Sequence, residues 1–205
     1  TEAEKGENKG LLKFIRWRKG REENVDLKLK VMGSFSSTAP YDCEKSQRIV
    51  EASVKAILED GVDFGLAVPS GGGGTYALFN VLGLMATGRE DVLPAINVKM
   101  RQIIDKPIDG YKWGHAWSLV TLAEYYLLTK DESVLPAIRK FATETANGQS
   151  KAGTWGHRFT NPDGSLRGYG TINQIGLAHT LGLVLAQKCG VTSPQVKRAG
   201  TKALN

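Results

Sequence analysis

The chain has 205 residues, 41% hydrophobic and 23% charged, a composition typical of a globular protein that excludes disordered and fibrous classes. Its net charge is +6, but basic and acidic residues are mixed along the chain, so we expect a solvated surface and no nucleic-acid partner. The longest nearly uncharged run, residues 62–85, is interrupted by Pro69 and four glycines, so no membrane-spanning helix is expected. Cys43 and Cys189 lie far apart without CxxC spacing, which indicates neither a metal site nor a disulfide framework. Two such cysteines do not identify an oxidising or a reducing compartment, and a periplasmic location is one of the alternatives.

Residues 1–33 predict a β-hairpin. The segments 12–17 and 25–31 are rich in β-formers, and the segment Arg18–Arg21 supplies a turn between them. We expect one buried face, packed on the following helices or on further strands, because a two-stranded hairpin is marginal alone. The pattern K-F-x-R-W-R-x-G-x-x-x-x-V-x-L-x-L resembles the closing hairpin of PDZ-like modules. The carboxylate-binding loop of those modules has no counterpart, so the resemblance implies no peptide-binding function.

Residues 34–45 form a Ser/Thr/Pro-containing linker, and residues 46–205 predict a mainly α domain of helical hairpins. Asp42 is expected to cap a first helix that ends near Glu59. The string V-L-P-A-I occurs at 92–96 and 134–138, and W-G-H occurs at 113–115 and 155–157, so both recur at an offset of 42 (134 − 92 and 155 − 113). That spacing is typical of one helical hairpin in a stacked array.

Each hairpin pairs an all-apolar helix with an amphipathic one. The apolar helices are expected at 75–86, 116–128 and 171–187, and their partners begin at Asp91, Ser133 and Ser193. This alternation predicts an α/α toroid, in which an outer ring of helices encloses an inner ring. A closed ring of about six hairpins needs about 250 residues, and the chain begins with Thr1 rather than Met, so we expect a fragment that forms an incomplete ring. The third unit carries an insertion, residues 158–169, with an Asn161–Gly164 turn able to tip a small β-hairpin.

The segment Gln149–Trp155, Q-S-K-A-G-T-W, looks like the QW motif of terpenoid cyclases. In that motif the Gln side chain bonds to the end of an outer helix and the Trp side chain packs over it. The resemblance therefore implies a structural role for Gln149 and Trp155. The acidic D-x-D-D motif of these cyclases is absent, and the zinc ligands of protein prenyltransferases cannot be placed. The whole arrangement also resembles an uncharacterised bacterial family in which a PDZ-like module precedes a toroid, and this resemblance implies no assigned activity.

His115 and His157 occupy the same place in successive repeats, where we expect the mouth of a loop that enters a buried helix. They are candidate catalytic residues, since an imidazole can serve as acid, base or ligand at a toroid rim. The alternative is that Trp-Gly-His is a structural joint of the repeat. Glu124 is a third catalytic candidate because it is the one charge within a buried helix; it could instead face a basic residue of an outer helix. The candidate substrate-binding residues are Trp113, Trp117, Trp155, Arg158, Tyr169 and Asn173.

No cofactor is indicated. The glycines Gly71–Gly74 precede Thr75 rather than the Lys of a P-loop, so the nucleotide interpretation is weak.

Two functions therefore remain open. The chain is either a toroid that binds or acts on a glycan or apolar small molecule, or a non-catalytic scaffold that binds a protein partner.

Overall fold

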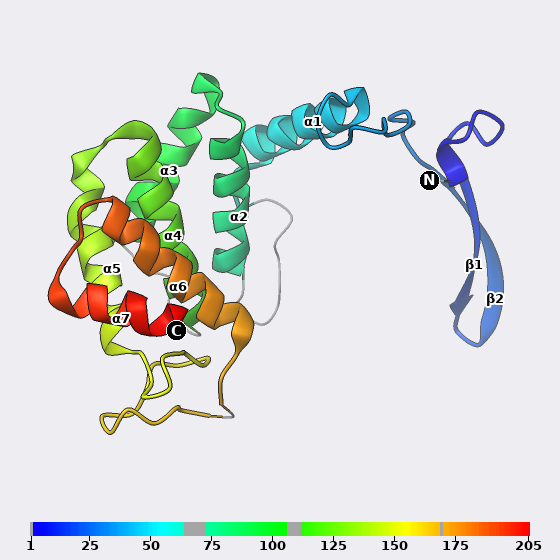
Figure 1. The fold of residues 1–205 in the computed structure, drawn as a ribbon. Helices are drawn as coiled ribbons and strands as arrows, with labels where there is room; N and C mark the ends of the chain where they lie inside the picture. The colour runs from blue at the N-terminus through cyan, green and yellow to red at the C-terminus, as the bar shows by residue number, and fades with distance from the viewer. Residues whose placement is uncertain (1, 64–72, 106–111, 169) are drawn as a thin grey trace. The chain divides into compact units, whose positions relative to one another are not determined.

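The computed structural model describes residues 2–63, 73–105, 112–168 and 170–205 (Figure 1). The chain divides into two compact units, Thr1–Ala56 and Ile57–Asn205. It is mainly helical with a short antiparallel hairpin near the N-terminus, which confirms the coarse prediction. Within the described residues, no helix combines the length and apolar character needed to cross a membrane.

The N-terminal unit holds the hairpin. Strands β1 (Leu11–Arg18) and β2 (Arg21–Lys28) pair antiparallel from Leu11↔Lys28 to Arg18↔Arg21. Lys19 and Gly20 close the turn with φ of 51° and 77°, as a two-residue type I′ turn requires.

Within the N-terminal unit neither face of the hairpin is covered, so the packing of one face on other structure stays a prediction. Alternate residues of a strand point to opposite faces, and apolar side chains are exposed on both. Leu12, Phe14 and Leu27 lie on one face, and Ile15 and Trp17 lie on the other. A ribbon of two strands buries only its cross-strand contacts when no layer covers it.

Helix α1 (Glu44–Asp60) begins after Cys43 rather than after Asp42. Asp42 has a φ of 45° and belongs to the preceding turn, so its side chain is not the helix cap. The buried ammonium of Lys45 lies 2.5 Å from the Glu4 carboxylate, which ties α1 to the short 3₁₀ turn η1 (Glu2–Glu4) within this unit.

The described residues of the helical unit form three successive helical hairpins. They are α2 (Gly73–Ala86) with α3 (Leu93–Asp105), α4 (Lys112–Thr129) with α5 (Leu135–Asn147), and α6 (Asn173–Lys188) with α7 (Pro194–Leu204). Helices α3 and α5 begin and end at the offset of the repeated strings (135 − 93 and 147 − 105), so repeated sequence corresponds to repeated structure. Each is preceded by a 3₁₀ turn, η2 (Glu90–Val92) or η3 (Glu132–Val134).

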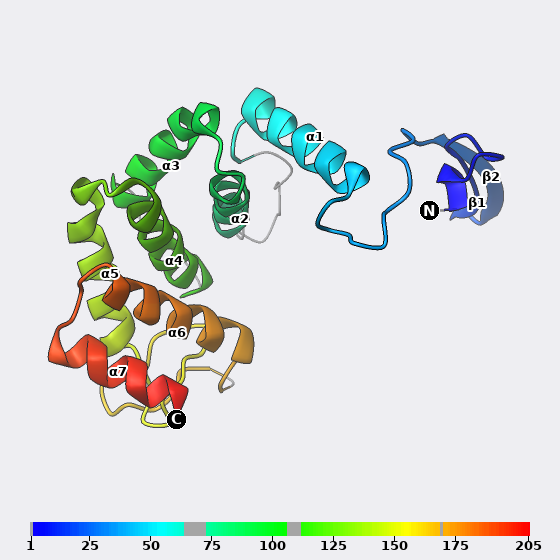
Figure 2. The ribbon, with the colours of Figure 1, turned by 45° about the horizontal axis from the view of Figure 1, so that its top comes forward.

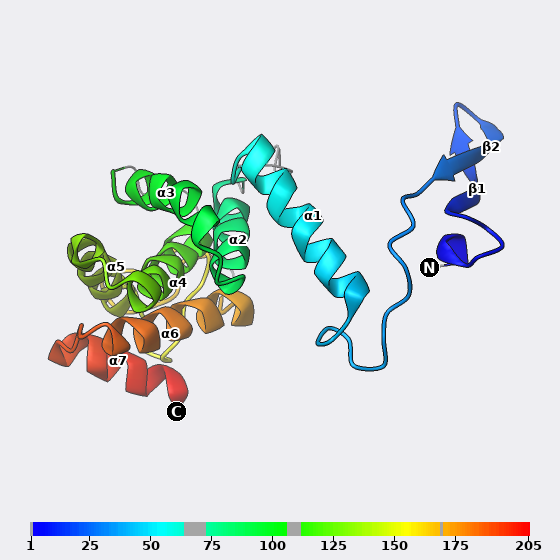
Figure 3. The same cartoon turned by 90° about the horizontal axis from the view of Figure 1, so that it is seen from above.

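The helices form two layers. Helix α4 lies between α2 and α6 and contacts both, while α3, α5 and α7 lie on the outer side of these three (Figures 2 and 3). The core between the layers is built from fully buried side chains, among them Leu78, Leu84, Ile96, Leu119, Leu122, Ile138, Ile175 and Leu183. Burial of each such side chain stabilises the fold by about 1.5–3 kcal/mol before the loss of chain entropy is counted.

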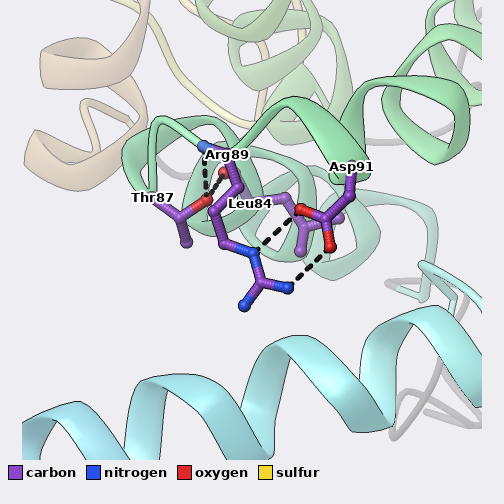
Figure 4. A network of polar contacts seen from close by, with 4 residues as sticks. All are labelled: Leu84, Thr87, Arg89 and Asp91. Atoms are coloured by element: carbon purple, nitrogen blue, oxygen red, sulfur yellow. Dashed lines mark hydrogen bonds and ion pairs between the residues drawn. The ribbon is translucent and has the colours of Figure 1, made fainter.

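A threonine closes the turn after α2 and again after α4. The Thr87 hydroxyl donates to the Leu84 carbonyl at 2.7 Å and accepts from the Arg89 backbone N–H at 3.3 Å (Figure 4). The Thr129 hydroxyl donates to the Tyr125 carbonyl at 2.8 Å and accepts from the Asp131 N–H at 3.2 Å. Thr87 and Thr129 are separated by the same offset as the repeated strings (129 − 87). The repeat therefore includes a threonine side chain whose hydrogen bonds end the inner helix.

The helix starts differ in part from the prediction. Ser193 caps α7 as predicted, since its hydroxyl accepts from the Val196 N–H at 3.4 Å. The caps expected at Asp91 and Ser133 are wrong, because a 3₁₀ turn precedes each outer helix. Asp131 caps η3 by accepting from the Ser133 N–H at 2.9 Å, and Asp91 pairs with Arg89 (Figure 4).

We predict that Thr129→Val lowers the free energy of unfolding by about 0.5–1.5 kcal/mol, because the Asp131 N–H and the end of α4 lose their shared partner. Thr121→Val is the matched control. The buried Thr121 hydroxyl donates only to the Trp117 carbonyl inside α4, so its loss should be near neutral. Urea denaturation followed by circular dichroism measures both, and equal effects would contradict a specific role for the turn.

Candidate functional site

A cluster of rings is buried between the two layers. The His115 ring lies 4.7 Å from that of Phe141, 5.0 Å from Phe159 and 5.9 Å from His179, measured between centroids. The Trp155 indole stacks on His179 at 5.1 Å. Helices α4, α5 and α6 and the loop after α5 each contribute to this cluster, and His115, His179 and Trp155 are all buried.

Hydrogen bonds fix the cluster to helix α5. His115 Nε2 lies 3.2 Å from the Phe141 carbonyl, and its Nδ1 lies 3.6 Å from the Glu144 carboxylate. Thr145 Oγ1 lies 3.3 Å from His179 Nδ1. Trp155 Nε1 donates to the Thr145 carbonyl at 2.9 Å, and this carbonyl belongs to the last turn of α5, where helical partners are missing. Trp155 therefore caps α5 and is not open to a ligand.

The two Trp-Gly-His copies differ in structure. The first lies in the first turn of α4, which starts four residues before the predicted helix, whereas the second lies in the loop sixteen residues before α6 (173 − 157). His115 and His157 therefore do not occupy equivalent places, contrary to the prediction. The copies nevertheless meet, since Trp113 Nε1 donates to His157 Nδ1 at 3.0 Å.

Gln149 ties the loop to the outer layer. Its side-chain amide donates to the carbonyls of Gly153 and Ala199, both at 2.9 Å, and Ala199 belongs to α7. Gln149 and Trp155 thus each satisfy a carbonyl of an outer helix, α7 and α5 respectively.

A second group of predicted residues lies on the opposite side of α4. Trp113, Trp117 and Glu124 are spaced four and seven residues apart and so share one face of this helix. The Phe79 ring of α2 meets the Trp117 ring edge-on at 4.7 Å and the Tyr76 ring at 6.2 Å. Helix α2 is predicted to be buried all round, yet Tyr76 and Phe79 are 44% and 41% exposed.

We call this surface the inner face and define it by Tyr76, Phe79, Trp113, Trp117 and Glu124. Leu177 and Leu181 are the exposed apolar residues of α6, spaced one turn apart. Tyr76 and Phe79 are site residues that were not predicted from the sequence. Helix α2 is apolar on nearly all sides, so the hydrophobic pattern does not tell which side is covered. The available signal was that Tyr76, Phe79 and Gly83 are spaced three and four residues apart and so lie on one stripe of the helix.

Residues 46–205 match the model of a family described as a domain of unknown function, DUF6288. The chain belongs to the DUF6288 family. No curated protein and no solved structure matches it.

The other predicted site residues of this DUF6288 member are dispersed. Arg158 and Asn173 are exposed, on the loop and at the first residue of α6. Tyr169 lies outside the described residues, as do Gly71 and Gly72. Glu124 lies nine residues beyond His115, about 13.5 Å along α4, so these two candidates are not brought together. No group of three His, Cys, Asp or Glu side chains able to hold a metal ion occurs in the described parts of the chain.

The insertion between α5 and α6 forms a turn without strands over its described residues. The Asp163 carboxylate accepts from the Ser165 hydroxyl at 2.6 Å and from the Ser165 N–H at 2.9 Å, and these bonds hold the pKa of Asp163 below its usual range. Asp163 thereby stabilises the turn.

Cys43 outside the family match has an unusual environment. The Ser46 side chain, then the Ser36 backbone N–H and the Ser46 backbone, donate to its Sγ and lower the pKa of Cys43 from 9.0 to about 6. Ser46 is the third residue of α1, so Cys43 Sγ occupies the position of an N-cap acceptor. Burial instead raises the pKa of Cys189.

We predict that Gly148→Ala destabilises the DUF6288 region. Gly148 has φ −82°, which any residue adopts, so backbone strain plays no part. A Cβ there would overlap the Phe159 ring, which packs against His115 and His179. We expect a loss of about 1–3 kcal/mol in thermal or urea unfolding.

Gly83→Ala in α2 is the control, because its Cβ meets nothing within 4 Å and should stabilise the helix by about 0.5–1 kcal/mol. Phe159→Leu should recover part of the Gly148→Ala loss in the double variant. Stabilisation by Gly148→Ala alone would show that Phe159 does not pack there.

We also predict that the Cys43 thiol ionises with a midpoint near pH 6, measured by thiolate absorbance at 240 nm in the Cys189→Ala variant. Because the folded pKa lies below the unfolded value, thiolate formation adds stability as pH rises from about 6 to about 9, and this contribution is lost as pH falls through 6. Ser46→Ala should raise the midpoint. A midpoint near 9 in the Cys189→Ala protein would contradict the assignment.

Proposed function

We propose that the helical unit is an arc of an α/α toroid that binds a small-molecule ligand on its inner face. Two features support the arc. Helices α2, α4 and α6 contact one another in sequence order inside α3, α5 and α7, and the Thr87 and Thr129 turns recur at the offset of the repeated strings. The bonding of Gln149 and Trp155 to outer-helix carbonyls adds support, since the cyclase-like motif assigns that role to these residue types.

The observation that carries the ligand proposal is that the exposed rings of Tyr76 and Phe79 contact each other and that Phe79 also contacts the half-buried Trp117. Large aromatic side chains normally move to the core, so several in mutual contact at a surface favour a binding role. Apolar or glycan ligands suit this face, because both present C–H surfaces that pack on aromatic rings. Concave sites with a few polar groups among apolar residues are the usual form of such sites.

Glu124 is the polar group of the inner face, which makes it the first candidate for catalysis if the ligand is a substrate. It lies two turns beyond Trp117, about 10.5 Å along the helix. His157 stands at the Trp113 end and is the second candidate. His115 and Trp155 act instead as positioning residues, because they are buried between the layers and hold α4, α5 and the loop together.

A scaffold function is the alternative, favoured by Leu177, which is 72% exposed. A protein partner that covers the exposed side of α6 would bury this residue and Leu181. The two functions differ in what Trp117 contributes, since a small ligand depends on the aromatic contact whereas a partner on α6 does not.

We predict that the full chain binds a member of one of two probe sets. The first is soluble xylan, hydroxyethyl cellulose and pullulan, tested by affinity gel electrophoresis. The second is farnesol and palmitate, tested by equilibrium binding. Trp117→Ala and Phe79→Ala should each weaken the bound probe by about tenfold or more, because each removes a large contact surface.

Val98→Ala on α3 is the matched control, because Val98 is exposed on the outer layer and should leave binding unchanged. Glu124→Gln should keep the affinity within about threefold and abolish turnover if the bound probe is processed. Failure of every probe to bind, or binding that survives both aromatic substitutions, would overturn the proposal and favour the scaffold function.

A further inference from the structure

The net charge of the chain is concentrated in the hairpin. Between Lys9 and Lys30 the sequence holds eight Lys or Arg and three Asp or Glu, a net charge of +5. The whole chain has 27 basic and 21 acidic residues, so the rest carries only +1 (19 − 18). Basic and acidic residues are therefore nearly balanced in the rest of the chain, whereas the segment from Lys9 to Lys30 is basic.

Cations converge at the tip of the hairpin. Arg18 and Arg21 stand directly opposite each other across the two strands, with Lys19 in the turn between them. Like charges in directly opposite positions destabilise a hairpin. Arg16 is neutralised by Glu23 at 2.8 Å, but no ion pair to Arg18, Lys19 or Arg21 occurs among the described residues. An anion bound at the tip would relieve this repulsion.

Apolar side chains adjoin these cations on both faces of the ribbon. Ile15 and Trp17 are 64% and 71% exposed on one face, and Phe14 is exposed on the other. Exposed Trp and aliphatic groups beside Arg and Lys are the combination found at membrane–water interfaces. A ribbon with apolar groups on both faces suits insertion of its tip, because an inserted tip meets lipid on every side.

We propose that the tip of the β1–β2 hairpin, residues 15–21, binds the surface of a membrane that contains anionic phospholipids. Arg18, Lys19 and Arg21 contact lipid phosphates, and Trp17 and Ile15 enter the headgroup region. Each cation near an anionic leaflet contributes roughly a fivefold gain in partitioning. This peripheral binding is independent of the ligand proposed for the inner face.

Nucleic acid is a poorer fit to the same charge. Single strands bind where aromatic rings line one surface and stack successive bases. Phe14 and Trp17 point to opposite faces of β1, so they cannot form one stacking surface. A protein partner on one face would leave the apolar residues of the other face exposed.

The test is co-sedimentation of the full chain with phosphatidylcholine vesicles, with and without about one third phosphatidylglycerol. We expect at least about tenfold stronger partitioning to the anionic vesicles and a loss of binding at high salt. The variant Arg18→Gln/Lys19→Asn/Arg21→Gln should lose at least about tenfold. Its turn becomes Asn-Gly, which favours the same type I′ geometry, so the hairpin should keep its fold.

The matched control removes three exposed cations from α5 and α7, by Arg139→Gln/Lys140→Gln/Lys197→Gln, and should bind as the parent does. Brominated phospholipids should quench part of the tryptophan fluorescence in the parent but not in Trp17→Phe, which retains an apolar side chain. Equal binding to uncharged vesicles, equal losses in both triple variants, or quenching unchanged in Trp17→Phe would each overturn the proposal. Absence of vesicle binding together with tight binding of a single-stranded oligonucleotide would assign the tip to nucleic acid instead.

Discussion

The close approach of helix α6 to its neighbours is the constraint on which the helical unit depends. A Cβ on Gly182 would lie 2.9 Å from Leu119 Cδ2, and a Cβ on Gly176 would lie 3.0 Å from Thr154 Oγ1, so a larger residue at either position would require the facing side chain to shift. His179 lies midway between them, three residues from each. The two glycines let α6 come close enough to α4 and the loop for the His179 ring to reach Trp155, His115 and Thr145.

The buried histidines in turn help to hold the described part of the long connection between α5 and α6 against the helices. Fixing each residue of such a connection costs about 1–2 kcal/mol in backbone entropy, and polar rings in a core cost more unless they are hydrogen-bonded. Trp155 and Phe159 offset the entropy cost of the connection and the cost of burying the imidazoles, because they pack on the imidazole rings and Trp155 also caps α5. The loop, both histidines and the end of α5 are therefore joined by ring contacts and hydrogen bonds.

The sequence predicted the mainly α class, the hairpin and the period of the helical repeat, because repeated strings and apolar spacing report local structure directly. The predicted equivalence of the histidines was wrong, since the insertion after His157 separates it from the start of α6, whereas His115 lies in the first turn of α4. The predicted caps of α3 and α5 were wrong for a different reason, because Asp and Ser residues precede a 3₁₀ turn as readily as a capped α-helix. The ring cluster joins residues of three helices and a loop, and no single-sequence pattern encodes such contacts.

Helix α4 carries the candidate site and the structural cluster on opposite sides. His115 and Trp117 are two residues apart, about 200° around the helix axis, so one faces the core between the layers and the other faces α2. The first Trp-Gly-His copy thus places its Trp toward the inner face and its His toward the core. The two copies therefore make different contacts despite their identical sequence, because His115 packs on Phe141 in the core whereas His157 accepts a hydrogen bond from Trp113.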